Sequence, residues 1–499
     1  MQKLNYLIIA HVMGILLVFN GLFMSFAVVT SWIYNEEDIL SQLLTAFLTV
    51  VIVGVLVMFF TRKHSKDLGT KEGYLIVTLG WIMMALSGTL PYLFTGTISS
   101  FTNAFFETIS GYTTTGATIV DDIEILPNGI LIWRSLTHWI GGMGIIVLTI
   151  AILPMFGIGG MQLFTAEAPG ISTDKLKPKI TDTAKRLWLI YFGFTAVETI
   201  LLHLAGMSVF DALNHALSTL STGGFSTKNA SLAYWNDNYW IQYIIILFMF
   251  FSGTNFVLFY FAFKLKIKKL FENEEFRWYA AIILISTLVS FLAVYFLGDL
   301  TLSSTQHPMV LGEMEATFRH SLFQVIAVVT TTGFVTSDFT SWLPFVSIFF
   351  FGLFFLGGSA GSTAGGVKIV RQVFLIKNGI LEFKRILHPN AILPMRYNNK
   401  SVDQKIVYNV LGFFILYMLS FIVGTLVMSL LGLDFMSSVG AAASSLGNVG
   451  PAFGDVSPVD NYNGLPVLAK WWSAFLMLLG RLELFTVLIL FTSYFWKKY

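Results

Sequence analysis

The chain has 499 residues, of which 55% are hydrophobic and only 12% are charged, with a mean hydropathy of +0.74. This balance excludes an ordinary water-soluble domain and is typical of a membrane protein. The sequence contains no cysteine, which excludes disulfides, thiolate metal sites and a cysteine nucleophile, and its formal net charge of +2 says little about partners.

Apolar runs recur along the whole chain, and most are long enough to cross a hydrocarbon core of roughly 30 Å. We predict about ten spanning helices, over residues 4–31, 40–61, 73–95, 130–153, 185–206, 239–263, 278–297, 343–375, 405–431 and 466–495. The first run is too long for a signal-peptide core, so we expect it to be retained. The predicted fold class is an all-α polytopic membrane protein.

Basic residues concentrate in alternate connections between these runs. They cluster in residues 62–71, 175–186, 264–277 and 377–405, whereas other connections such as 35–38 and 121–124 are acidic. Because cytoplasmic loops carry an excess of Lys and Arg, we expect the basic connections and both termini to be cytoplasmic.

A glycine motif returns four times in connections that we expect to face outward. It reads TTTGAT from Thr113, STGGFST from Ser221, TTTGFVT from Thr330 and LGNVGPAFG from Leu446. Aligned on Gly116, Gly223, Gly333 and Gly450, the copies are separated by 107, 110 and 117 residues. A spacing this regular indicates internal duplication.

A short stretch of about eleven residues precedes each motif: FTNAFFETISGY, FDALNHALSTL, FRHSLFQVIAVV and FMSSVGAAASS. Such stretches are too short to span a bilayer and are tolerated in it only where protein or water covers them. We therefore predict four re-entrant half-helices around a pseudo-fourfold axis. The expected units are a leading two-helix unit (1–66) and four repeats of helix, pore half-helix and helix (67–165, 180–270, 274–380 and 400–499).

The motifs carry the chemistry that a dehydrated cation needs. Rings of backbone carbonyls replace an ion's water shell, and glycine adopts backbone angles that aim successive carbonyls at one axis. Partial negative charge at the C-terminal end of each half-helix also favours a cation. The predicted ion filter comprises Thr114, Thr115, Gly116, Ser221, Thr222, Gly223, Thr331, Thr332, Gly333, Asn448, Val449 and Gly450. The alternative is that each motif only caps its half-helix, a role that is compatible with ion binding.

Two long strings then point to a family. With HWIGGMGIIVLTIAILPMFGIGGMQLFTAEAPG from His138 and LLGRLELFTVLILF from Leu478, the chain resembles the TrkH subunits of the Trk, Ktr and HKT superfamily of potassium transporters over nearly its whole length. The resemblance places the filter glycines on the four motif positions. It implies potassium passage, because relatives that favour sodium often have serine at the first glycine. The fourth motif departs from the others, since Asn448 and Val449 replace hydroxyl residues.

A glycine-rich segment interrupts the eighth run. GGSAGSTAGG, residues 357–366, cannot form a good helix, which predicts a broken loop lining a cavity. Close helix packing by small residues is one alternative, and a phosphate cradle is a second that the missing Ser or Thr after Lys368 disfavours. The resemblance makes this segment a gating loop, with Gly357, Gly358, Gly361, Gly365 and Gly366 as its glycines.

Arg481 lies near the centre of the last run, too far from either end to reach the membrane surface easily. A charge at this depth is costly and usually functional. We predict that Arg481 points into the pore, donates hydrogen bonds to the 357–366 loop and sets an electrostatic barrier. Pairing with Glu483 is the alternative, but residues two apart do not share a helix face.

Other ionisable residues give weaker signals. Glu107 and Glu198 lie in apolar helices, where each either has a functional role or only bonds a neighbouring helix. The histidines, among them His138, His203, His215 and His320, show no metal-ligand spacing. We expect no metal site and no cofactor in this chain, with potassium as the substrate.

The predicted function is potassium uptake through the filter and the gating loop, driven by the membrane potential. The alternatives are an alternating-access carrier coupled to protons or sodium, and an enzyme, for which no nucleophile or metal cluster is evident. The resemblance implies a homodimer in the bacterial inner membrane with a cytoplasmic TrkA-like ring that binds NAD or ATP. We expect that ring to dock on the basic loops Lys175–Lys185 and Lys377–Lys405.

Overall fold

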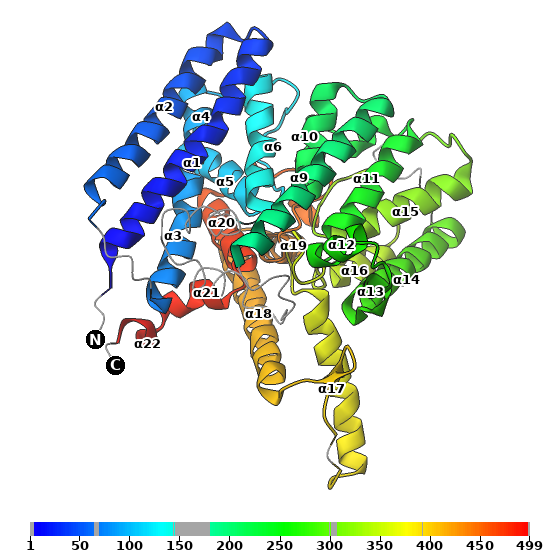
Figure 1. The fold of residues 1–499 in the computed structure, drawn as a ribbon. Coiled ribbons are helices and arrows are strands. Elements are labelled where there is room, and N and C mark those ends of the chain that lie inside the picture. The colour runs from blue at the N-terminus through cyan, green and yellow to red at the C-terminus, as the bar shows by residue number, and fades with distance from the viewer. Residues whose placement is uncertain are drawn as a thin grey trace.

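The computed structural model describes residues 4–63, 69–142, 144, 180–298, 300, 307–391 and 393–497. Within these residues the chain is built almost entirely of helices (Figure 1), and its one sheet is a small antiparallel hairpin of β1 (Arg396–Tyr397) and β2 (Lys400–Ser401). The predicted all-α class is confirmed. The later part of the predicted run 130–153 and residues 175–179 of the basic segment 175–186 lie outside the described residues.

The helices follow the chain in this order: α1 (Tyr6–Ile33), α2 (Glu37–Phe60), α3 (Thr70–Gly88), α4 (Leu90–Thr95), α5 (Phe101–Tyr112), α6 (Asn128–Gly142), α9 (Ile180–Leu204), α10 (Val209–Leu220), η2 (Ser231–Trp235), α11 (Tyr239–Ser252), α12 (Phe256–Phe263), α13 (Lys268–Glu272), α14 (Glu274–Leu297), α15 (Glu313–Val329), α16 (Pro344–Leu353), α17 (Ile369–Leu387), α18 (Gln404–Leu430), α19 (Phe435–Gly447), η4 (Gly454–Val456), α20 (Val467–Arg481), α21 (Phe485–Leu488), η5 (Ile489–Phe491) and α22 (Ser493–Trp496).

Six stretches in the described residues are helical, long and apolar enough to cross a membrane: Tyr6–Ile33, Glu37–Phe60, Thr70–Thr95, Lys185–Leu204, Glu274–Leu297 and Gln404–Leu430. Two further helix pairs are sharply bent, by 103° between α11 and α12 and by 111° between α20 and the α21–η5 segment. The predicted runs 239–263 and 466–495 are therefore broken, although each bent pair together is still apolar enough to be one span. Each bend lies at a short polar stretch, residues 252–255 and 480–483, but the flanking apolar residues keep the mean hydropathy of each run high.

All four stretches that precede the glycine motifs are helical, as predicted. They form α5, α10, α15 and α19, and each helix ends at its motif. Side chains cap the N-termini of α10 and α19. Ser208 accepts a hydrogen bond from the backbone amide of Asp211, and Asp434 accepts one from the backbone amide of Ser437. The third, α15, is longer than expected, with 17 residues that begin at Glu313.

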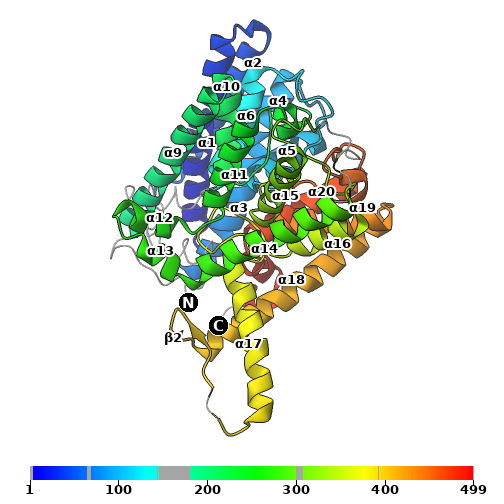
Figure 2. The ribbon, with the colours of Figure 1, turned by 90° about the vertical axis from the view of Figure 1, so that its right-hand side faces the viewer.

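One end of the molecule carries the chain termini and a projecting arm. The N- and C-termini lie close together there, and α17 extends away from the helical body beside the β1–β2 hairpin (Figure 1 and Figure 2). The side-chain nitrogen of Lys71 donates to the carbonyl of Lys497 at 3.1 Å, which joins the start of α3 to the C-terminal segment. The arm carries the basic segment 377–405, so the basic residues gather where the termini lie.

The leading helices α1 and α2 pack closely because glycines face each other across their interface. A Cβ atom at Gly54 would lie 2.8 Å from the backbone nitrogen of Val18 and 2.9 Å from the carbonyl oxygen of Gly14. Small residues of this kind let helix backbones approach in a membrane, where the hydrophobic effect between helices is weak.

Replacing Gly54 by alanine should therefore destabilise the fold by about 1–3 kcal/mol, because the methyl group meets backbone on both sides. Thermal unfolding of the detergent-purified protein measures this effect. The matched control is Gly193→Ala in α9, where a Cβ meets nothing within 4 Å. Equal melting temperatures for the two variants would contradict this account of the interface.

Candidate functional site

The four glycine motifs share one backbone turn, which begins directly after each half-helix. Its first residue has positive φ in every copy: Thr114 (53°), Thr222 (57°), Thr331 (55°) and Asn448 (55°). Two residues later a glycine again has positive φ: Gly116 (79°), Gly224 (83°), Gly333 (73°) and Gly450 (98°). We call residues 114–116, 222–224, 331–333 and 448–450 the four motif turns.

These angles correct the register of the second motif by one residue. Gly224, and not Gly223, occupies the place of the other three glycines, while Gly223 corresponds to Thr115, Thr332 and Val449. The hydrogen bonds agree, because Thr115 N donates to Ser110 O and Gly223 N to Ser218 O, each five residues back. The two adjacent glycines of STGGFST make both registers plausible from sequence.

The motif turns contact one another in a closed ring. A Cβ atom at Gly116 would lie 2.1 Å from Gly223 O, one at Gly224 2.1 Å from Thr332 O, one at Gly333 2.0 Å from Val449 O, and one at Gly450 2.5 Å from Thr115 O. Each glycine thus meets a carbonyl of the next turn, and the fourth returns to the first. No residue with a side chain fits at these four positions.

The ring contains backbone strain that helices hold in place. Thr114, Thr222 and Thr331 are β-branched residues in the left-handed region, at most 1% exposed, and such outliers cost on the order of 1–3 kcal/mol each. Just before each of them a hydroxyl donates back to its own half-helix at 2.7 Å: Thr113 to Ile109 O, Ser221 to Leu217 O and Thr330 to Ile326 O. Strain concentrated in this way is typical of functional sites.

The fourth turn replaces threonine by an asparagine that bonds to two neighbours. Asn448 tolerates the left-handed region better than a β-branched residue does. Its amide nitrogen donates to Thr115 Oγ1 at 3.0 Å and to Met477 O at 2.9 Å. Asn448, which departs from the threonine of the other motifs, therefore links the fourth turn to the first.

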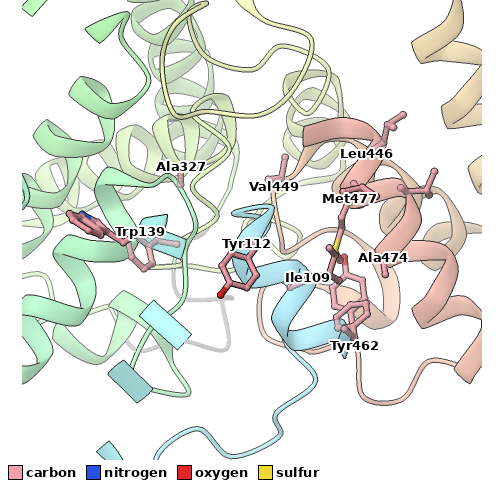
Figure 3. Close-up of a cluster of buried hydrophobic side chains, with 14 of the residues drawn as sticks. Ile109, Tyr112, Trp139, Ala327, Leu446, Val449, Tyr462, Ala474 and Met477 are labelled. Atoms are coloured by element: carbon pink, nitrogen blue, oxygen red, sulfur yellow. The ribbon is translucent and has the colours of Figure 1, made fainter. Parts of the chain in front are cut away.

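Apolar side chains pack closely around the turns (Figure 3). Tyr112 of α5, Leu446 of α19 and Met477 of α20 are fully buried, as is Val449 of the fourth turn itself. This packing removes most alternative positions for the half-helix ends, because a core at native density transmits any shift to its neighbours.

The glycine-rich segment is a broken loop, as predicted. Helix α16 ends at Leu353 and α17 begins at Ile369, and residues 357–366 between them are not helical. The loop lies against the motif turns, because Gly365 N donates to Thr331 Oγ1 at 2.7 Å and Thr363 Oγ1 donates to Leu220 O at 2.9 Å.

The other side of the loop bonds to the break between α11 and α12. Ser359 N donates to Gly253 O at 2.8 Å, and Phe256 N donates to Gly361 O at 3.1 Å. The bend in one segment and the loop in another thus satisfy each other's backbone groups, as non-helical chain inside a membrane requires. Glu275, at the start of α14, also accepts from Ala360 N at 2.7 Å.

Arg481 bonds to the loop, as predicted. Its guanidinium donates to Thr363 O at 2.7 Å and also to Gly141 O at 2.6 Å and Gly142 O at 3.0 Å. The alternative pairing with Glu483 is wrong, because Glu483 forms an ion pair with Arg371 of α17. The guanidinium of Arg481, at the end of α20, therefore joins the end of α6 to the 357–366 loop.

Several residues at this site were not singled out in the sequence. Thr363 lies in the loop and bonds to the end of α10, Glu275 accepts from the loop, and Arg371 pairs with Glu483, but nothing in the spacing of these residues along the chain relates them. Burial and the neighbouring Arg319 lower the pKa of His307 to about 4, so this ring is neutral near pH 7. It places no positive charge beside Ser337, which it contacts at 3.2 Å.

The chain is similar in sequence to known transport proteins. The family model of TrkH, described as a cation transport protein, matches residues 39–498. The chain is 38% identical to the Trk system potassium uptake protein TrkH of Vibrio parahaemolyticus, covering 98% of this chain and 99% of the relative. It is also 38% identical to the Escherichia coli protein of the same name, with 91% of each covered, and 34% identical to TrkG of E. coli, with 98% and 99% covered.

The fold agrees as well. The crystal structure of the potassium transporter TrkH from V. parahaemolyticus superposes with a TM-score of 0.87 at 36% identity, covering 99% of this chain and 100% of that one. Members of the matched family are membrane ion transporters and not enzymes. On this evidence the chain is a multi-pass membrane protein that belongs to the TrkH family of cation transport proteins.

Proposed function

We propose that this chain is the ion-translocating subunit of a potassium uptake system and that the ring of motif turns is its ion filter. The observation that carries the proposal is the closed ring itself. Carbonyl oxygens of Thr115, Gly223, Thr332 and Val449 each lie against a glycine of the adjacent turn, at the C-terminal ends of four half-helices. Carbonyl oxygens and helix C-termini together replace the water shell of a cation.

The filter residues follow from the corrected register. They are Thr114, Thr115, Gly116, Thr222, Gly223, Gly224, Thr331, Thr332, Gly333, Asn448, Val449 and Gly450, with Ser221 as the cap of α10. The curated relatives are named potassium uptake proteins, which supports potassium as the substrate. Glycine at all four positions fits the same ion. We infer that the ring belongs to four repeats around a pseudo-fourfold pore.

The 357–366 loop and Arg481 form the gate in this proposal. The loop bonds to the third turn through Thr331 and to the end of α10 at Leu220, while Arg481 holds the loop through Thr363. An ion leaving the filter inward meets this loop next. The membrane potential supplies the driving force, about 2.3 kcal/mol per charge per 100 mV.

The basic end of the molecule is the cytoplasmic side in this proposal, in a bacterial inner membrane, with both termini inside. The chain works as a homodimer, and its regulatory partner is a cytoplasmic TrkA-like ring that binds a nucleotide. The Trk system names of the relatives support a multi-component assembly. The projecting arm, residues 369–405, offers the docking surface on the described part of the chain.

An alternating-access carrier coupled to protons or sodium is the second candidate, favoured by the two bent helix pairs, since such carriers use discontinuous helices. Rubidium uptake into vesicles that contain this chain alone separates the two. Rapid saturable uptake driven by potential alone supports the filter. Uptake that requires a proton or sodium gradient supports the carrier.

Replacing Gly333 by alanine should lower rubidium uptake by roughly tenfold or more. The new Cβ would lie 2.0 Å from Val449 O, on a residue with a φ of +73°. Gly352→Ala in α16, where a Cβ meets nothing within 4 Å, is the matched control. Normal flux through a correctly folded Gly333→Ala protein would exclude this ring as the filter.

Replacing Arg481 by alanine should raise the flux several-fold, because the loop loses the cation that holds Thr363 and the ion path loses a positive charge. Flux assays on the purified chain measure this, with Lys63→Ala, at an exposed position shortly after α2, as the control. If Arg481→Ala leaves both conductance and ion affinity unchanged, Arg481 is not part of a gate.

Charge reversal on the projecting arm should abolish binding of the cytoplasmic ring. Lys384→Glu with Lys400→Glu changes two exposed residues there, and co-purification of the two proteins is the measurement. Lys228→Glu, outside the arm, is the control and should bind normally. Full retention of the ring by the double variant would count against docking on the arm.

A further inference from the structure

Each half-helix has an equivalent position nine residues before its motif glycine. In the corrected register these residues are Glu107, His215, Gln324 and Ala441. Three of them are polar and buried, and each contacts the chain that leaves its own motif turn. Glu107 accepts from Thr118 Oγ1 and Ile119 N at 3.0 Å, His215 Nε2 lies 2.9 Å from Ser226 Oγ, and Gln324 lies 3.3 Å from Thr336 Oγ1.

The first of these residues, Glu107, is paired with a cation. Arg134 of α6 donates to Glu107 Oε1 at 2.8 Å, and the two side chains are 1% and 0% exposed. The carboxylate is therefore neutralised where it lies, so it does not attract ions to the ring. Its effect on the motif turns must be geometric.

Arg134 extends the contact from the first turn to the second. Its guanidinium donates to Ser226 O at 3.2 Å and to Thr118 Oγ1 at 3.3 Å, and its central carbon lies 4.2 Å from the centroid of the Phe225 ring. Phe225 and Ser226 directly follow Gly224, and Thr118 lies two residues after Gly116. One guanidinium thus contacts the exits of two adjacent motif turns.

The contact continues to the ring of carbonyls. Phe225 stacks on His138 with centroids 4.0 Å apart, and His138 Nδ1 lies 3.3 Å from Ser218 Oγ. A Cβ atom at Gly223 would lie 2.2 Å from His138 Nδ1. The His138 ring therefore lies directly behind the residue whose carbonyl faces Gly116.

We propose that the Glu107–Arg134 pair is a positioning device that fixes the separation of the first and second motif turns and thereby sets the preference for potassium over sodium. This inference rests on the proposed function. A buried ion pair is weak evidence for a stabilising role, since apolar residues of similar volume often stabilise as well. The same pair is suited to positioning, because its bonds are directional and all reach groups beside the two turns.

The positions of the other buried polar groups agree with this role. At the third turn Arg319 pairs with Glu315 and donates to Gln242, and Asn236 connects Gln242 to Thr336 O. That network reaches the turn's exit through amides and not through the arginine itself. The first junction is therefore the one at which changing a single charged residue disturbs two turns at once.

The test measures rubidium uptake into proteoliposomes. It compares the potassium concentration that inhibits this uptake by half with the sodium concentration that does the same, and the ratio of the two concentrations reports the ion preference. Glu107→Gln and Arg134→Lys should each lower potassium preference by roughly tenfold, the change expected for losing one buried hydrogen bond to a charged group. The double variant should be no worse than the single ones, because the two residues act as a unit. Lys228→Gln, which breaks the partly exposed Lys228–Glu124 pair, is the matched control and should leave the ratio unchanged.

Glu107→Gln leaves Arg134 as a buried unpaired charge and so is liable not to fold. A second variant, Phe225→Leu, leaves the ion pair intact and keeps the test valid in that case. Phe225→Leu removes the stacking between Arg134 and His138 and should shift the ratio in the same direction by a smaller factor. Unchanged ion preference in a folded Arg134→Lys or Phe225→Leu protein would overturn the inference.

Gly333→Ala separates failure of this inference from failure of the proposed function. If Gly333→Ala lowers flux while the Glu107 and Arg134 variants keep the normal ratio, the filter stands and the positioning role is wrong. If Gly333→Ala also has no effect, the ring is not the filter and both proposals fail.

Discussion

The constraint on which this structure depends is the close approach of backbone to backbone at four glycines. Gly116, Gly224, Gly333 and Gly450 each meet a carbonyl oxygen of the next turn at a distance that excludes any Cβ atom. These contacts join segments that are more than 100 residues apart in sequence, and the contact between Thr115 and Gly450 joins segments more than 300 apart. The half-helices must therefore end at defined places, and the packing around them follows from that requirement.

The ring is held from behind and from below. Behind it, hydroxyl groups of Thr113, Ser221 and Thr330 bond back to their half-helices, and Arg134 joins the exits of the first two turns. Below it, the 357–366 loop satisfies the backbone that the α11–α12 bend leaves open. Strained turns persist only where their surroundings over-determine them, and here two independent sets of hydrogen bonds do so.

The elements with a strong local signal could be predicted from sequence. The four half-helices follow from their length and composition, and the broken loop follows from its glycines. The bond from Arg481 to the loop follows from the cost of a charge at that depth. The bends at Gly253 and Glu483 could not be predicted from mean hydropathy, because the apolar residues on both sides outweigh the short polar stretch at each bend. Neither could the pairing of Glu107 with Arg134, which lie on different helices, nor the register of Gly224, where two glycines adjoin.

The most direct test of the filter is to locate the ion itself. Crystals grown with rubidium or thallium in place of potassium should show anomalous density on the axis of the ring, among the carbonyls of Thr115, Gly223, Thr332 and Val449. Substituting sodium should remove or weaken that density at equal concentration. Density located instead at the helix bends, with none on the axis of the ring, would contradict the account.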